Sequence, residues 1–115
     1  MYFVLVAKDK PTGDLRAKRR LAHLEFIADK QSAFKFGGPL LDEAGKVAGS
    51  LMILEMEDRA ALDRYMAQDP YFKDGGIFDS VEVYQTRWIV PEENPGALKA
   101  EIERQKAADR QRGGQ

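Results

Sequence analysis

The sequence contains no cysteine and only one histidine. Without cysteine, the chain has no disulfide, no thiolate nucleophile and no cysteine-based metal site. A single histidine argues against a zinc site within one chain, because such sites take several histidine, cysteine or carboxylate ligands. Carboxylates remain available to a hard cation, but the default expectation is a protein without a bound metal or a cofactor.

Long hydrophobic runs and a large net charge are missing as well. No apolar run approaches the ~20 residues that span a bilayer, and the first seven residues read as a strand without the basic region of a secretion signal. The 18 basic and 19 acidic residues leave a net charge of −1, which provides no field to attract nucleic acid. No glycine-rich nucleotide-binding motif occurs. These absences predict a cytoplasmic protein with no membrane or nucleic-acid partner.

The 115 residues, 43% of them hydrophobic, fit one domain with a single core. Alternating and helical patterns predict strands at 2–8, 34–41, 47–56 and 80–90, and helices at 15–31 and 58–68. This β-α-β-β-α-β order predicts an α+β fold of the ferredoxin-like type, with four antiparallel strands and both helices on one face.

The first predicted helix has an apolar stripe whose members recur at spacings of three and four: Ala17, Leu21, Leu24 and Ala28, widened by Phe26 and Ile27. Asp14 and Asp58 are the expected N-caps of the two helices. In the predicted strand 34–41, the sequence Gly37-Gly38-Pro39 indicates a strand that lies at a sheet edge, faces a ligand, or both.

Both faces of the predicted strands carry apolar side chains, although two helices can cover only one face. In the first strand, Phe3 and Leu5 alternate with Val4 and Val6. A solvated face would be largely polar, so we expect the uncovered face to meet a second copy of the chain. The sequence therefore predicts a homodimer that associates through the sheet face.

The composition changes after residue 90. We expect a domain at 1–90 and a charged C-terminal extension at 91–115, partly helical or disordered. Within it, 97–112 reads as a short docked helix or a frayed segment, and 113–115 as disordered.

The only histidine, His23, and the distant Asp69 form the candidate catalytic pair. Histidine exchanges a proton near neutral pH, and a carboxylate at one ring nitrogen would fix the tautomer. The structural alternatives are a half-buried histidine that packs on the sheet, and an aspartate that caps the second helix. The two roles of Asp69 are compatible.

Six further residues are candidates for binding a substrate. An anionic substrate would be held by Arg19 or Arg20, which share the side of the helix that carries His23. The backbone at Gly38 and Pro39, the Ser50 hydroxyl and the Tyr71 ring would complete the pocket. The structural alternatives are solvated arginines, a bulge in the hairpin, a serine that fills a small position, and a tyrosine in the core.

These motifs, in this order, make the chain resemble the YciI-like (YCII-related) family. The resembling elements are Tyr2-Phe3-Val4-Leu5, Arg19 and Arg20 followed by His23-Leu24-Glu25-Phe26-Ile27, Gly37-Gly38-Pro39-Leu40, Gly49-Ser50, Asp69-Pro70-Tyr71 and Val81-Glu82-Val83. They span residues 1–90. The chain departs from the family pattern at Phe34-Lys35-Phe36, where members tend to have smaller residues.

The resemblance implies a dimeric ferredoxin-like α/β barrel whose site pairs His23 with Asp69. Some members look like lyases that remove a halide from a hydroxylated chloro-aromatic, and muconolactone-type isomerases share the wider fold. The leading hypothesis is therefore a cofactor-free lyase or isomerase for a small, anionic, cyclic or aromatic metabolite. The alternatives are a non-catalytic dimeric module that binds a metabolite or regulates a partner, and a structural dimer without a ligand.

Overall fold

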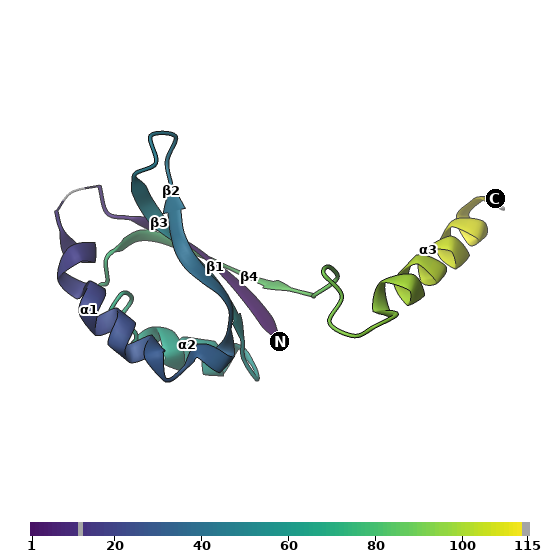
Figure 1. Ribbon diagram of the computed structural model, residues 1–115, viewed down its shortest axis with the longest axis horizontal. Helices are drawn as coiled ribbons and strands as arrows, with labels where there is room; N and C mark the ends of the chain where they lie inside the picture. Colours follow the sequence, from purple (N-terminus) through teal and green to yellow (C-terminus); the bar gives the residue numbers. More distant parts are fainter. Residues whose placement is uncertain (12, 114–115) are drawn as a thin grey trace.

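The computed structural model describes residues 1–11 and 13–113, and Figure 1 shows a sheet with two helices on one of its faces. In chain order, the elements are β1 (Tyr2–Asp9), α1 (Leu15–Ala28), a 3-10 turn (Gln31–Ala33), β2 (Phe34–Leu41), β3 (Val47–Glu55), α2 (Arg59–Gln68), β4 (Phe78–Thr86) and α3 (Ala97–Gly113).

The sheet has the strand order β2-β3-β1-β4, and every neighbouring pair is antiparallel. Both α1 and α2 lie on the same side of it (Figure 1). The α+β class and the antiparallel sheet predicted from the sequence are confirmed, and the arrangement is compatible with the ferredoxin-like plan. Strand β2 lies at an edge of the sheet, which is one of the positions predicted from Gly37-Gly38-Pro39.

The core lies between the helices and the inner face of the sheet. Its main cluster consists of Phe3, Leu5, Met52, Leu54, Leu62 and Tyr65. A second cluster joins Ala7 to the segment after α2, through Tyr71, Ile77 and Phe78. Each large apolar side chain that leaves water contributes about 1.5–3 kcal/mol. These clusters therefore hold α2 and the segment that follows it against the central strands.

The predicted apolar stripe of α1 does not face the core. Ala17, Leu21, Leu24 and Ala28 are exposed, and Leu21 reaches 68% exposure. The inward face instead carries His23, with Phe26 partly buried beside it. Periodicity identifies a stripe but does not decide which stripe meets the sheet. Here His23 shares the inward face with Phe26, which belongs to the widened edge of the predicted stripe.

The two ends of α1 also differ from the sequence prediction. The helix stops at Ala28, three residues short of residue 31, and a 3-10 turn follows. The Asp14 side chain makes no capping hydrogen bond and pairs with Lys18 at 3.2 Å. In contrast, Asp58 caps α2 as predicted, because its carboxylate accepts the Ala61 N–H at 2.8 Å.

Strand β4 begins and ends earlier than the predicted range 80–90. Its last residue, Thr86, pairs with Tyr2, which is the first residue of β1. Beyond Thr86 the partner strand has run out, so a ladder cannot continue even though the sequence stays β-prone. Trp88 packs against the Tyr2 ring instead, with the ring centroids 5.4 Å apart.

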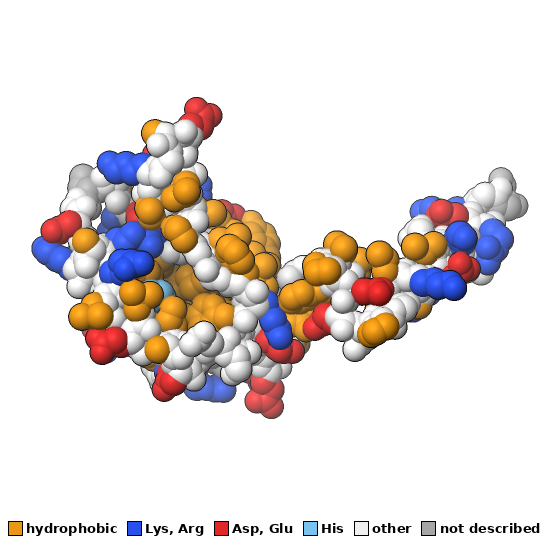
Figure 2. All heavy atoms as spheres, in the orientation of Figure 1, with side chains coloured by type: hydrophobic (Ala, Val, Ile, Leu, Met, Phe, Trp, Pro, Cys, Tyr) orange, Lys and Arg blue, Asp and Glu red, His pale blue; other side chains and the backbone are white. Residues whose placement is uncertain are grey.

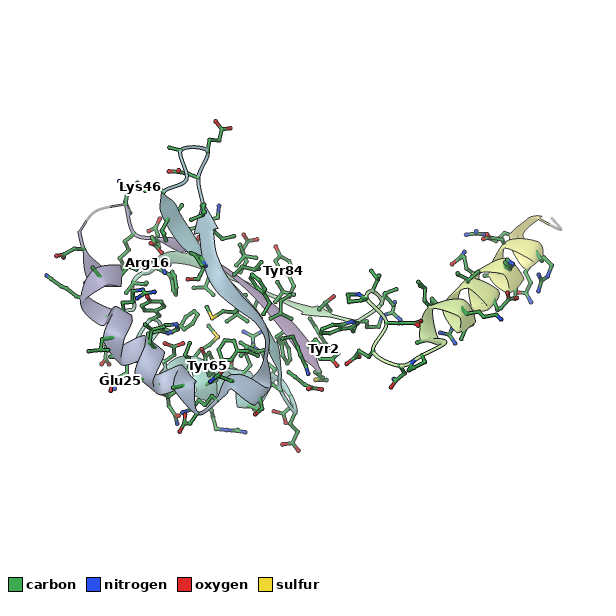
Figure 3. All side chains as sticks on the ribbon, in the orientation of Figure 1. Tyr2, Arg16, Glu25, Lys46, Tyr65 and Tyr84 are labelled. Atoms are coloured by element: carbon green, nitrogen blue, oxygen red, sulfur yellow. The ribbon has the colours of Figure 1, made fainter. Side chains whose placement is uncertain are left out.

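The outer face of the sheet is apolar at its centre. Val4 pairs with Ile53 on one side and with Tyr84 on the other, and Val6 pairs with Leu51. The Tyr84 ring is 54% exposed and points away from the helices (Figure 3). The expectation of apolar groups on both sheet faces is therefore met.

The extension leads away from the domain and ends in α3 (Figure 1). The segment is helical, as one of the two predictions for it stated. Its apolar residues Leu98 and Ile102 are exposed, so the helix is not docked on the domain. The hydroxyl of Tyr2 donates to Glu93 at 2.6 Å, which raises the pKa of Tyr2 to about 12. Thr12 lies outside the described residues, as do Gly114 and Gln115, which are predicted to be disordered.

None of the helices among residues 1–11 and 13–113 combines the length and the apolar character needed to cross a membrane.

The close approach of β1 and β3 at Gly49 generates a prediction for stability. A Cβ at Gly49 would lie 2.1 Å from the carbonyl oxygen of Ala7, so two paired backbones would have to separate. We expect Gly49→Ala to lower the free energy of unfolding by about 3 kcal/mol, at the upper end of overpacking costs. Urea denaturation followed by circular dichroism measures this change.

The matched control is Gly37→Ala in β2, where an added Cβ would meet only the Phe34 ring at 3.3 Å. This ring can shift, so we expect a loss below about 1 kcal/mol. Equal denaturation midpoints for the two variants would contradict the argument.

Candidate active site

A cavity of about 550 Å³ opens between α1, β2, β3 and the segment after α2. Figure 2 shows this hollow, with the histidine colour inside it, apolar side chains around it and basic side chains at its rim. The predicted site residues that line it are Arg20, His23, Gly38, Pro39, Ser50 and Tyr71. The fold therefore gathers residues from three elements and one loop around a single space.

His23 and Asp69 meet, although 46 residues separate them in the sequence. The His23 Nδ1 lies 2.8 Å from Asp69 Oδ1. Asp69 has no exposed surface, and His23 is 9% exposed. Asp69 is the C-cap of α2, where the following Pro70 disfavours a helical backbone, so the chain turns at this point and directs the carboxylate toward α1.

Two further donors hold the same carboxylate. The Tyr71 N–H donates to Oδ1 at 2.9 Å, and the Tyr65 hydroxyl donates to Oδ2. Burial and the neighbouring charge of Asp69 raise the pKa of Tyr65 well above its usual range, so its hydroxyl keeps its proton. Two roles were predicted for Asp69 from the sequence, as a cap at the end of α2 and as the partner of His23. The carboxylate makes both contacts, because it accepts from the Tyr71 backbone amide and lies beside the imidazole.

Because the carboxylate accepts on both oxygens, we assign the ring proton of neutral His23 to Nδ1. Such a hydrogen bond fixes the tautomer and leaves Nε2 with a free lone pair. The Tyr71 ring stacks on the imidazole, with the centroids 3.8 Å apart and the planes at 5°. The carboxylate and the tyrosine together fix both the tautomer and the orientation of the imidazole.

Arg16, which was absent from the predicted site residues, also lines the cavity. Its Nε and Nη2 donate to the two oxygens of Asp9 at 2.8 and 2.7 Å, and Nη2 donates to Ser50 Oγ at 2.9 Å. The hydrogen bonds to Asp9 raise the pKa of the Arg16 guanidinium. Arg16 precedes His23 by seven residues, about two helical turns, and this spacing is the signal that could have identified it.

The two arginines predicted to bind an anion have different positions. Arg20 lines the cavity, whereas Arg19 donates to the carbonyl oxygens of Pro70 and Lys73 at 3.1 and 2.8 Å. Arg19 is not among the residues that line the cavity. It holds the segment that carries Asp69 and Tyr71.

Lys10 holds the next part of the same segment. Its Nζ donates to the carbonyl oxygens of Gly75 and Gly76 at 3.2 and 3.0 Å. Gly76 has a φ of +61°, and a Cβ there would lie 2.7 Å from the Tyr71 carbonyl oxygen. The loop is thus fixed by two cations and by a glycine that no larger residue can replace without strain.

The edge strand β2 forms one wall of the cavity. Gly37, Gly38 and Pro39 contribute to the lining, together with the bulkier Phe34 and Phe36. The expectation that this strand lies at an edge and faces the pocket therefore agrees with the geometry. Across residues 1–11 and 13–113, no group of three or more histidine, cysteine, aspartate or glutamate residues is placed to hold a metal ion.

The sequence model of the YCII-related domain family matches residues 1–88. Among solved structures, the chain is similar to the 5-chloro-2-hydroxyhydroquinone dehydrochlorinase TftG from Burkholderia phenoliruptrix AC1100, in complex with 2,5-dihydroxybenzoquinone. The identity is 28%, the TM-score is 0.66, and the match covers 76% of this chain and 94% of the dehydrochlorinase chain. No curated protein matches the sequence.

The hydrogen bond between His23 and Asp69 predicts the tautomer of the imidazole. The ring ¹⁵N chemical shifts of the single histidine should show a protonated Nδ1 and a bare Nε2 in the neutral form. We expect Asp69→Asn to weaken this preference, because an amide offers a donor as well as an acceptor. The matched control is Asp63→Asn on the exposed side of α2, which should leave both shifts unchanged. A wild-type ring protonated at Nε2 would contradict the assignment.

Proposed function

The chain belongs to the YCII-related domain family, and we propose that it is a lyase or isomerase that needs no cofactor. His23 moves a proton on a small, anionic, cyclic or aromatic metabolite, and Asp69 holds the imidazole. The observation that supports this most directly is the 2.8 Å contact between Nδ1 and the buried carboxylate. It leaves Nε2 as the free nitrogen of a histidine that lines the cavity.

The chemistry follows from this geometry. Nε2 takes a proton from the substrate, and the positive charge that develops on the ring lies beside the Asp69 carboxylate. The electron pair left on the substrate then expels a leaving group or moves along a conjugated system. A positioned general base of this kind contributes typically ~10²–10⁴-fold in rate.

The similarity to TftG supports an elimination of this type. A dehydrochlorination removes a proton and a chloride ion, and a chlorinated hydroxyhydroquinone becomes a hydroxybenzoquinone without an external oxidant. The lining of the cavity is mixed, with apolar residues such as Tyr71 and Met52 and polar residues such as Arg20 and Ser50, and a hydroxylated aromatic ring has the same two kinds of surface. We therefore take halogenated hydroxy-aromatics as the first substrate class to test.

The second candidate function is a non-catalytic module that binds a metabolite. It is favoured by one observation: Asp69 accepts the Tyr71 N–H at 2.9 Å, so the carboxylate also has a structural role in the turn. Under this hypothesis the cavity binds its ligand without turnover, and replacement of His23 leaves the affinity for that ligand unchanged.

We also propose a homodimer, in which the outer sheet faces of two copies pack together as an α/β barrel. The support is the apolar centre of this face, formed by Val4, Val6, Leu51, Ile53 and Tyr84. Among residues 1–11 and 13–113, no helix covers this face (Figure 1), and a second identical sheet has the matching shape and polarity.

Replacement of the imidazole tests the catalytic proposal. We expect wild-type protein to release chloride from 5-chloro-2-hydroxyhydroquinone or a related chlorinated hydroxy-aromatic, and His23→Gln to lower kcat/KM by ~10²-fold or more. A chloride-selective electrode measures the release under anaerobic conditions. Glu25→Gln is the matched control, because Glu25 lies on the exposed side of α1 (Figure 3). A His23→Gln variant with full turnover would refute the role of the base.

A charge on the outer face tests the dimer. We expect light scattering to give twice the chain mass of 13.0 kDa for the wild type. Tyr84→Glu should shift the protein toward the monomer, since two carboxylates would face an apolar interface. Leu21→Glu, on the exposed side of α1, is the control and should remain dimeric. A wild-type monomer at micromolar concentration would overturn the proposal.

A further inference from the structure

A second cavity, of about 340 Å³, lies between the C-terminal end of α1, the start of β2 and α2. Its volume is within the range of small-molecule sites, roughly 300–1,000 Å³. Of the described residues, only Phe34 borders both this cavity and the one that contains His23. The two cavities are therefore separate spaces with one wall residue in common.

The inner wall of the second cavity is aromatic. The centroid of the Tyr65 ring lies 5.8 Å from that of Phe26 and 5.9 Å from that of Phe34. Met56 adds a thioether side chain, which adapts to irregular apolar shapes. Phe26, Phe34 and Met56 are only partly buried against the core, so part of their apolar surface is free to contact a ligand.

The charged residues that line the second cavity are both cations. They are Lys30 and Arg64, and no described aspartate or glutamate lines it. Lys30 Nζ lies 4.0 Å from the Phe26 ring centroid and uses two of its three N–H groups, on the Phe26 carbonyl oxygen and on Asp29. Arg64 makes no hydrogen bond or ion pair with another described residue. The cavity therefore offers unused cationic donors beside an aromatic wall.

We propose that the second cavity binds a small carboxylate with an aromatic or branched apolar body. The carboxylate accepts from Arg64 and from the remaining N–H of Lys30, and the apolar body packs against the Tyr65 ring and its neighbours. A guanidinium holds a carboxylate through two parallel hydrogen bonds, which gives the anion a defined orientation. The site goes beyond the proposed function, because it needs neither turnover nor His23.

Tyr65 connects the second cavity to the candidate catalytic pair. Its ring lines the second cavity, and its hydroxyl donates to Asp69 Oδ2. A ligand that packs against this ring acts on one of the hydrogen bonds that hold the carboxylate beside His23. Occupancy of the second cavity therefore reaches the imidazole through a continuous chain of contacts.

Methionine methyl groups report on the two cavities separately. The sequence has four methionines, of which Met56 lines the second cavity and Met52 lines the cavity that contains His23. Protein labelled with ¹³C at these methyl groups is titrated with 4-tert-butylbenzoate and with the uncharged 4-tert-butylbenzamide. We expect a saturable shift of the Met56 signal, and an affinity for the carboxylate roughly tenfold higher than for the amide.

Two pairs of variants on α2 test the contacts. Arg64→Gln should remove the preference for the carboxylate and leave the affinity for the amide unchanged. Its matched control is Arg59→Gln, because Arg59 pairs with Asp63 at 2.9 Å and does not line the cavity. Ala61→Leu should fill the cavity and block both probes, whereas Ala60→Leu, at an exposed position outside the lining, should not. Circular dichroism checks that each variant is folded.

The inference is overturned if the Met56 signal does not shift at millimolar probe, or if Arg64→Gln keeps the preference for the carboxylate. It is also overturned if the probe binds only in the other cavity. That result would be a Met52 shift that Arg20→Gln removes and Ala61→Leu leaves in place.

The proposed function and this inference can fail separately. His23→Gln should bind the carboxylate with wild-type affinity, read at Met56, whether or not the chain has turnover. In the wild type, the ring ¹⁵N signals of His23 should shift over the same range of probe concentration. A Met56 shift without a His23 shift would reject the connection through Tyr65 and leave the second site in place.

Discussion

The buried carboxylate of Asp69 is the constraint on which the rest of the site depends. A carboxylate without exposed surface is costly unless its lone pairs are satisfied. Here His23 from α1, Tyr65 from α2 and the Tyr71 backbone amide satisfy it. The same three contacts connect both helices to the segment that follows α2. The group that orients the imidazole is therefore also a structural junction, and its two roles are physically inseparable.

The cationic side chains near the site have separate roles. Arg19 and Lys10 donate to backbone carbonyls and fix the loop after α2, whereas Arg16 is paired with Asp9 inside the cavity. Arg20, the third arginine of this part of α1, also lines the cavity and makes no hydrogen bond or ion pair with a described residue. The cavity thus presents the oriented donors of Arg16 together with the charge of Arg20, which suits a small anionic ligand.

Much of the architecture could be predicted because strand alternation, the Asp58 cap and Gly37-Gly38-Pro39 are local signals. The misplaced stripe of α1 shows the limit: Leu21 and Leu24 have the right spacing, yet the sheet meets His23 and Phe26. The end of β4 was misjudged for a related reason. A strand ends where its partner ends, and Tyr2 is too far away in the sequence to be recognised as that partner.

The sequence by itself determined the class of fold, the family resemblance and the absence of thiol chemistry, since composition and periodicity depend on near neighbours along the chain. It also identified His23 and Asp69 as candidates for proton transfer, because histidine and aspartate are residue types suited to it. Only the tertiary structure brought them to 2.8 Å, placed Arg19 on the loop and introduced Arg16 with Asp9 and Ser50. The physical reason is that these contacts join residues up to 54 positions apart, and their geometry exists only after the helices and strands have packed.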